Sequence, residues 1–377
     1  MIGILDAFYF YGHHFLVDPG PDPQNQDLAK VFLAGRGFDP ARLDELPVGL
    51  FVQREVMEAC LQKAGFSSAE VRRSGLTSDP RLAGRLVGPV RDRHGRIVSF
   101  WARHPHNGDA KYLLLHKDWH QQVPAIGLDT ALTPAAGGEN HLILVEGLLD
   151  MLLLHCRGIF HVAAIGGPAR EFGPERWEQL AELGVRRVTL LLDRHPASQQ
   201  RMAAALEHCF RAKTAPTVYV VLPAQLGEMS GPGELVRVRG AEQFLWLVER
   251  ERVHAYHCKA LTLLAQHNTE SGWLPASREQ ALEAAVNFYL VHARQHRRDL
   301  STFFLPPILE ELMPERPRVA LWEETEAVTD APDAAPELPP EAPAISLPEP
   351  PVAARPRKSS GYCELHHCDS SECFCFD

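Results

Sequence analysis

The segment His141–Gly167 constrains the fold of this chain more than any other, because it places an aliphatic run directly before a carboxylate. The residues from Leu142 to Val145 are all aliphatic, which is typical of a strand buried on both faces of a parallel sheet. Glu146 follows this run, and Gly147 favours a turn into the next element. The sequence therefore predicts a strand that ends in an acidic residue.

A second strand of the same kind is predicted from Val188 to Leu192, and it ends at Asp193. Between the two strands, the pattern indicates a helix at 148–157, a short strand at 161–165 and a helix at 174–183. Strands and helices that alternate at these lengths indicate an α/β fold with right-handed crossovers. Ligands of such sheets bind beyond the carboxyl ends of the strands, so Glu146, Asp150 and Asp193 are expected at one edge.

Carboxylates at such an edge suit a magnesium or manganese ion, which prefers hard oxygen ligands and leaves positions for water and phosphate. The ion would polarise a phosphoryl oxygen or activate a nucleophile. Alternatively, Glu146 and Asp193 are ordinary loop or helix-capping acids, as in many unrelated α/β domains. The spacing alone does not separate these two interpretations.

The amino-terminal third contains clear helix starts and a hairpin. Asp39 before Pro40 indicates a helix start, and Ser67 with Glu70 forms a capping box whose helix is expected to end at Gly75. Strands are predicted at 88–91 and 96–103, joined by the turn sequence Asp-Arg-His-Gly.

Basic residues gather on and after this hairpin, although the whole chain has a formal charge of -10. Such a cluster can bind a phosphate backbone or a triphosphate through charge-assisted hydrogen bonds. The alternative is a solvated hairpin whose wet face carries charge. The cluster comprises Arg85, Arg91, Arg93, Arg96, Arg103, Lys111 and Lys117.

The acidic strand ends resemble the Toprim domain, the metal-binding fold shared by topoisomerases and bacterial DnaG-type primases, in the motifs VEGLLD and LLLDRHPAS. Four segments further upstream resemble, in the same order along the chain, the amino-terminal half of the DnaG polymerase core. They are DLAKVFLAGRGFDPARLDEL, AGFSSAEVRRSGL, GRLVGPVRDRHGRIVSFWAR and AKYLLLHK. The segment GELVRVRGAEQFLWLVE resembles the helical part that closes that core. The resemblance covers roughly residues 25 to 265, and motifs that occur together in order are more specific than any one of them.

The resemblance implies a Toprim parallel sheet flanked by helices at 136–240. It also implies an α+β subdomain with the basic hairpin at 1–135 and a helical region at 241–315. The implied partners are single-stranded DNA, ribonucleoside triphosphates and a replicative helicase, although no helicase-binding motif is evident. By this resemblance the catalytic positions would be Glu146, Asp150 and Asp193, and template or nucleotide contacts would be made by Arg85, Arg103 and Lys111. His195 is a further candidate for the catalytic site, and Arg96 and Lys117 of the basic cluster are further candidates for nucleic-acid contacts.

Two departures from the family pattern weaken the case for two-metal chemistry. The expected Asp-x-Asp pair reads Asp193-Arg194-His195, and glycines stand at 231 and 233 where aspartates are expected. Glu228 and Glu234 lie close to these glycines in the sequence. His195 is either a ligand of a softer ion such as manganese or zinc, or a turn residue. The remaining acids still suffice for one metal ion.

The carboxyl-terminal part differs from the rest in composition. Residues 316–360 are rich in Pro, Ala and Glu, which predicts a disordered linker. Residues 361–377 are expected to bind zinc in place of the amino-terminal zinc module of DnaG, which the chain is expected to lack. A disulfide cluster and a tail of free thiols are the alternatives. The proposed ligands are Cys363, His366, Cys368, Cys373 and Cys375, whereas Cys60, Cys156, Cys209 and Cys258 look like buried thiols.

No membrane segment is evident, because no stretch approaches about eighteen uninterrupted apolar residues. The apolar start of the chain lacks a basic region and a cleavage site, so it is not expected to be a signal peptide. The expected location is the cytoplasm.

Three functions remain open on this reading. The first is a primase-like nucleotidyltransferase that makes short RNA primers. The second is a Toprim nuclease of a mobile element or defence system, which would use the same acids for hydrolysis. The third is a nucleic-acid-binding relative that kept the fold but lost catalysis.

Overall fold

The computed structural model describes most of the first 259 residues and two short strands near the carboxyl terminus. The described residues are 3–105, 111–115, 123–133, 136, 140–166, 172–255 and 258–259, with the backbone of 362–363 and 368–369. The chain divides into two compact units, Met1–Ile308 and Leu309–Asp377.

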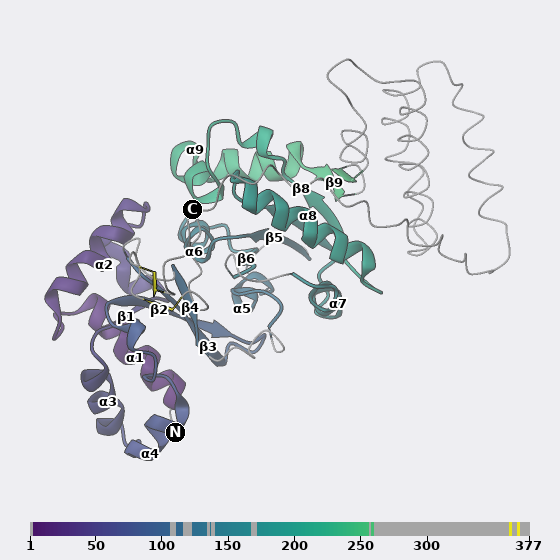
Figure 1. Ribbon diagram of the computed structural model, residues 1–377. Coiled ribbons are helices and arrows are strands. Elements are labelled where there is room, and N and C mark those ends of the chain that lie inside the picture. The colour runs from purple at the N-terminus through teal and green to yellow at the C-terminus, as the bar shows by residue number, and fades with distance from the viewer. Residues whose placement is uncertain are drawn as a thin grey trace, which may run out of the picture. The chain divides into compact units, whose positions relative to one another are not determined.

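The amino-terminal part contains an antiparallel sheet covered by helices (Figure 1). Within the described residues, this sheet has four strands in the order β1-β2-β3-β4. Helix α1 packs against it through Phe8, whose ring lies 4.8 Å from that of Phe100. The elements are α1 (Ile4–Val17), α2 (Pro23–Gly35), η1 (Pro40–Glu45), β1 (Gly49–Phe51), α3 (Arg54–Lys63), α4 (Ser68–Ser74), η2 (Pro80–Leu82), β2 (Arg85–Arg91), β3 (Ile97–Arg103) and β4 (Tyr112–Leu114).

The predicted helix starts and the hairpin are confirmed. Asp39 accepts a hydrogen bond from the amide of Ala41, although the helix that begins there is a 3-10 helix rather than an α-helix. Ser67 and Glu70 form the capping box of α4, and Gly75 ends that helix in the left-handed conformation. Strands β2 and β3 pair antiparallel across the predicted turn, and β2 begins earlier than predicted.

The following part contains the predicted parallel sheet. Within the described residues it has five strands in the order β6-β5-β7-β8-β9; β9 is antiparallel to β8, and the other neighbours are parallel. The predicted elements are confirmed to within a residue or so at each end. The elements are α5 (Leu128–Ala131), β5 (His141–Val145), α6 (Leu148–Cys156), β6 (Val162–Ala164), α7 (Pro174–Glu182), β7 (Arg187–Leu191), α8 (Pro196–Arg211), β8 (Thr217–Val220), η5 (Pro223–Leu226), α9 (Pro232–Trp246), η6 (Leu247–Glu251) and β9 (Val253–His254).

The buried core explains why the two sheets belong to one unit. Ile143 and Val145 of β5 belong to the same hydrophobic cluster as α6, α9 and the amino-terminal sheet. Helix α7 packs against α8, where Trp177 is fully buried and donates a hydrogen bond to the carbonyl of Ala205 at 3.0 Å. Alternate residues of a strand point to opposite faces, so β5 is buried on both sides, as its aliphatic run predicts.

His141, at the start of β5, gives the fold an expected pH dependence. Its Nε2 lies 2.8 Å from Thr189 Oγ1, and its Nδ1 lies 3.2 Å from Glu249 Oε1. Burial, and after it the nearby Arg252, lower the pKa of His141 to about 3. A histidine in the unfolded chain titrates near about 6.5, so the unfolded state binds more protons as the pH falls below that value.

The free energy of unfolding is therefore expected to fall by roughly 2 kcal/mol between pH 7 and pH 5 through this histidine. Urea denaturation at the two pH values measures the change, and H141Q should show a clearly smaller one. Equal pH dependence in the wild type and H141Q would contradict this assignment.

Several predictions concern residues at or beyond the limits of the described chain. Most of the predicted helical region 241–315 and all of the linker 316–360 lie outside the described residues. Of the four cysteines predicted to be buried, Cys209 is buried, Cys60 and Cys258 are half-buried, and Cys156 is exposed, so that prediction was wrong for Cys156. In the described part of the chain, no helix combines the length and the apolar character needed to cross a bilayer.

Candidate active site

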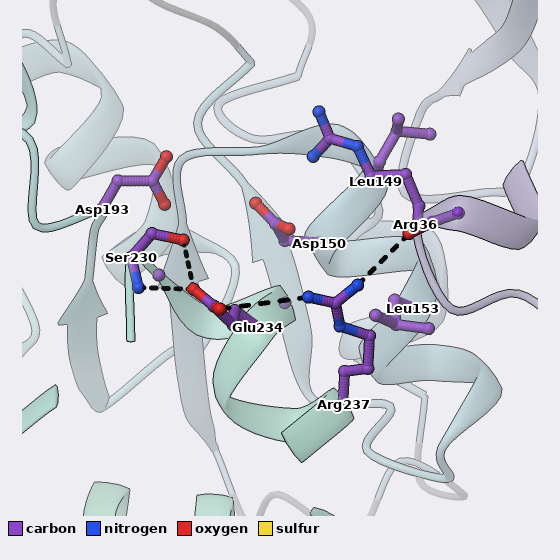
Figure 2. Close-up of a pocket in the computed structure, with 11 residues that line it drawn as sticks. Arg36, Leu149, Asp150, Leu153, Asp193, Ser230, Glu234 and Arg237 are labelled. Carbon is purple, nitrogen blue, oxygen red and sulfur yellow. Dashed lines mark hydrogen bonds and ion pairs between the residues drawn. The ribbon is translucent and has the colours of Figure 1, made fainter. Parts of the chain in front are cut away.

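Two of the predicted acids share one pocket at the carboxyl edge of the parallel sheet. Asp193 follows β7, and Asp150 lies in the first turn of α6, which begins just after β5. Both line a pocket of about 310 Å³, together with Gly231, Gly233 and Glu234 at the start of α9. Figure 2 shows the acids on one side of this pocket and two arginines, Arg36 and Arg237, on the other.

The glycines of the α9 start are in close contact with these acids. A Cβ added to Gly231 would lie 2.2 Å from Asp193 Oδ1, and one added to Gly233 would lie 2.1 Å from Asp150 Oδ1. The loop is fixed here because the amide of Arg194 donates to the carbonyl of Ser230 at 2.7 Å. Aspartates at 231 and 233 would collide with the acids already present, so the glycines are part of the site's shape.

Burial and neighbouring carboxylates raise the pKa of both acids. Burial, followed by the Asp150 and Glu146 carboxylates, raises the pKa of Asp193 to about 7. Burial also raises the pKa of Asp150, and Arg36 opposes this effect. The Glu146 carboxylate raises the pKa of both acids, and Asp150 also raises that of Asp193, so a nearby cation would stabilise their ionised forms.

Glu146 lies beside this pair but is not among the residues that line the pocket. Its Oε1 accepts a hydrogen bond from Nη2 of Arg201, which also donates to Ser198 Oγ at 3.0 Å. The other oxygen, Oε2, is buried and has no hydrogen-bond partner among the described residues, and the same is true of Arg201 Nε. Glu146 is therefore already paired with a cation of the chain itself.

The arginine side of the pocket is held in place by backbone contacts. Arg237 of α9 donates to the carbonyl of Gly35 at 3.2 Å, and its Nη2 lies 4.0 Å from Glu234. Arg157, which follows α6, donates to the carbonyl of Gly37 at 3.3 Å. Arg36 lies between these two anchored residues, and its own side chain is exposed. The end of α2 is thus joined to the parallel-sheet part at the pocket.

Arg36, Arg201 and Arg237 are not among the site residues predicted from the sequence. Arg36 lies within one of the motifs that carry the family resemblance, and Arg237 stands three residues after Glu234 on one helix. Arg201 has no comparable signal, because its partner Glu146 is 55 residues away in the sequence.

The structure places the predicted basic residues in different environments. Arg85 and Arg103 are almost fully buried, at 1% exposure each. Arg103 packs with its guanidinium 5.1 Å from the ring of Tyr112, and it donates to the carbonyl of Lys111 at 3.3 Å. Arg96 is exposed at the hairpin and pairs with Asp92 at 2.6 Å.

Lys111 is the predicted basic residue with the clearest connection to the acids. Its side chain is exposed, and its charge lowers the pKa of both Asp150 and Asp193. Partial burial and the neighbouring Arg103 lower the pKa of Lys111 itself. Lys117, the remaining predicted contact, lies outside the described residues.

His195 has a structural part in the described fold. Its ring nitrogen Nδ1 accepts a hydrogen bond from the amide of Ala197 at 3.2 Å, which makes it the N-cap of α8. Glu234 accepts hydrogen bonds from the amide and the hydroxyl of Ser230 at 2.8 and 2.7 Å. Both contacts help to hold the loops around Asp193.

The donor set fits one divalent ion. Asp150 and Asp193 offer hard oxygens in a pocket with space for water and phosphate, which suits magnesium or manganese. Among the residues that the structure describes, no three histidine, cysteine or acidic side chains gather as a metal-binding group.

The close approach of Gly233 leads to a testable expectation. In G233A, the new methyl group displaces the Asp150 carboxylate, which can rotate because it ends a side chain. The manganese affinity of the site is expected to fall about tenfold, while the melting temperature changes little. Isothermal titration measures the affinity. G35A is the matched control, since a Cβ at this pocket-lining glycine meets nothing within 4 Å; equal losses in both variants would contradict the prediction.

Comparison with known proteins agrees with the amino-terminal part of this description. Residues 22–116 match the family model of the DNA primase catalytic core, N-terminal domain. A DNA primase from Streptomyces coelicolor is 28% identical over 275 residues, which cover 69% of this chain and 41% of that protein. The chain therefore spans less than half the length of this relative.

Solved structures of primases share the fold. A DNA primase domain from Pseudomonas aeruginosa aligns with a TM-score of 0.64 at 20% sequence identity, covering 86% of this chain and 97% of that one. A DnaG primase catalytic domain bound to single-stranded DNA aligns with a TM-score of 0.61 at 20% identity, covering 86% of this chain and 96% of that one. The chain thus has the mixed α/β fold of the DnaG catalytic core.

Proposed function

We propose that this chain is a DNA primase-like protein that binds single-stranded DNA and joins ribonucleotides in the pocket between Asp193 and Arg36. The observation that carries the proposal is that one pocket combines two hard-oxygen acids with two arginines. Acids that hold a divalent ion and arginines that bind phosphate are the parts that phosphoryl transfer needs. The similarity to primases, and to a DnaG catalytic domain bound to single-stranded DNA, supports the choice of substrates.

In this proposal the two sides of the pocket have separate tasks. Asp150 and Asp193 hold magnesium or manganese, and the ion supplies charge stabilisation to a reacting phosphoryl group. Arg36 and Arg237 bind the phosphates of the nucleotide or of the nucleic-acid chain through charge-assisted hydrogen bonds. Lys111 adds positive charge that acts on both acids, and the buried Arg103 donates a hydrogen bond to its backbone carbonyl.

The hairpin between β2 and β3 is the proposed path for the template. Arg93 and Arg96 are exposed there, and the charge lies on the same subdomain as Arg36. The side chains of Arg85 and Arg103 are buried, so in this conformation they would affect template binding only indirectly, through the strands that carry them. Binding of this kind depends mainly on phosphate contacts and weakens as the salt concentration rises.

A second candidate function is a nucleic-acid-binding protein without catalysis. It is favoured by the pairing of Glu146 with Arg201, which withdraws one of the expected metal ligands. The absence of aspartates at 231 and 233 points in the same direction. The two functions share the DNA-binding surface and differ in whether Asp150 and Asp193 support catalysis.

One experiment separates the two functions. The full chain is incubated with a single-stranded DNA template, ribonucleoside triphosphates and either magnesium or manganese. Short RNA products support the primase-like function, and DNA binding without RNA products supports the second candidate. A protein that neither binds the DNA template nor makes RNA would refute both functions.

The wider assignments of the family resemblance belong to the same proposal. The parallel sheet within 136–240 is proposed to be a Toprim domain, which its strand order and the acids at its carboxyl edge support. The helical region 241–315 is proposed to contact a replicative helicase. A pull-down with the helicase of the same organism, with and without this region, tests that contact.

Zinc binding by residues 361–377 is a proposal from composition. The described backbone there places β10 (Tyr362–Cys363) antiparallel to β11 (Cys368–Asp369), so that Cys363 and Cys368 are register partners. His366, Cys373 and Cys375 would complete the ligands. Metal analysis of the full chain is expected to give one zinc ion that is lost when 361–377 are deleted; equal zinc contents would refute the proposal.

A further inference from the structure

We propose that Arg201 takes the place of a second metal ion at this site and limits it to one divalent ion, an inference that rests on the proposed metal-binding function. The relevant contact is the hydrogen-bonded ion pair between Arg201 Nη2 and Glu146 Oε1. Arg201 acts as a positioning residue, since it contacts Glu146 rather than the pocket.

The location of the pair supports this inference. Arg201 lies in α8, within the element that follows Asp193, and its side chain reaches back to the residue after β5. The side chains of Arg201 and Glu146 are 27% and 13% exposed, and neither residue lines the pocket in the described part of the chain. The pair therefore lies outside the set of residues that line the pocket.

The charges of the cluster agree with a single ion. Glu146, Asp150 and Asp193 bring three carboxylates close enough for Asp150 and Glu146 to raise the pKa of Asp193. Arg201 contributes one fixed positive charge in direct contact with the cluster. Counting only these three acids and Arg201, two negative charges remain when all three acids are ionised, and one divalent ion balances them. A second divalent ion would leave the buried cluster with excess positive charge, which is costly.

The hydrogen bonding of Glu146 and Arg201 also indicates that no metal ion binds beside Glu146. Glu146 Oε2 and Arg201 Nε are both buried and have no partner among the described residues. Glu146 thus keeps a free oxygen, but any ion that bound there would be next to the guanidinium. Like charges at this distance repel, so the free oxygen does not bind a metal ion while Arg201 is present.

Substitution of Arg201 tests the inference through metal binding rather than activity. The number and affinity of bound Mn²⁺ ions are measured by electron paramagnetic resonance and equilibrium dialysis on the full chain. Residues 361–377 are the same in every variant, so differences between variants report on this site. The wild type is expected to bind one Mn²⁺ that is lost in D193N. R201Q is expected to bind a second Mn²⁺.

Three further variants make the result specific. R201K keeps the positive charge and should behave like the wild type, which separates charge from packing. In R201Q/E146Q the additional Mn²⁺ binding expected of R201Q should disappear, because the Glu146 carboxylate that would hold the ion is removed. R211Q removes an exposed arginine at the end of the same helix and should change nothing. Melting curves confirm that each variant is folded.

The outcomes distinguish this inference from the proposed function. An R201Q protein that is folded but binds Mn²⁺ as the wild type does would overturn the inference, whatever the primer assay shows. A wild type that already binds two Mn²⁺ ions sensitive to E146Q would overturn it as well. A wild type that makes no RNA would refute the proposed function, while a gain of Mn²⁺ in R201Q would still support the role of Arg201.

Discussion

Replacing Asp193 by asparagine is expected to reduce primer synthesis at least about a thousandfold, equivalent to about 4 kcal/mol of lost transition-state stabilisation. Asparagine keeps the size of the side chain but removes the negative charge that would hold the metal ion. The carboxylate is half-buried in the pocket, and the backbone of Gly231 lies close against it. The rate of RNA formation on a single-stranded template, measured under single-turnover conditions, checks the prediction.

The control for this variant is D44N, which neutralises an exposed acid of the amino-terminal part. It should retain the wild-type rate. D193N should also still bind single-stranded DNA within a few-fold of the wild type, since the arginine side of the pocket is unchanged. A D193N protein that makes primers at the wild-type rate would show that the proposed metal site is misplaced.

Removing both pocket arginines, in R36Q/R237Q, is expected to weaken binding of single-stranded DNA about a hundredfold at low salt, with about tenfold from each residue. A charge-assisted hydrogen bond to phosphate is lost at each position, and glutamine cannot supply the charge. Fluorescence anisotropy of a labelled oligonucleotide at several salt concentrations measures the effect. The salt dependence should also become shallower, by roughly 0.7 per lost phosphate contact.

R73Q serves as the matched control, because it removes an exposed arginine of the same subdomain at the end of α4. It should shift the affinity only slightly. If R36Q/R237Q and R73Q have the same small effect, DNA does not bind at the pocket. If the double variant binds DNA normally but no longer uses ribonucleotides, the arginines bind the nucleotide rather than the template.

The sequence was sufficient to predict the sheet that carries the site. The runs 142–145 and 188–192 are apolar apart from Thr189, which favours strands buried on both faces of a sheet. The strands β5 and β7 are neighbours in the sheet, so their acids meet at one edge as expected. The capping box at Ser67 was equally predictable, because it depends on residues three positions apart.

The composition of the site was less predictable, because it depends on contacts between distant segments. Arg201 and Glu146 meet only after α8 has packed on the sheet, and no local pattern connects them. The hairpin arginines look alike in the sequence, yet Arg103 is buried under Tyr112 whereas Arg96 is exposed. The glycines at 231 and 233 read as lost acids, whereas in the structure they leave the space that Asp150 and Asp193 fill.

The two arginine contacts to the backbone around Arg36 have a consequence for how the protein can be divided. Arg237 and Arg157 belong to the parallel-sheet part of the chain. They donate hydrogen bonds to the carbonyls of Gly35 and Gly37, which flank Arg36. A fragment that begins after the antiparallel sheet would keep its carboxylates but would have no Arg36 opposite them. A fragment that ends before the parallel sheet would keep Arg36 but would lose the two hydrogen bonds that hold the backbone beside it. Neither half is expected to recover substrate binding when expressed alone, whereas co-expression of the two could restore it by reassembly.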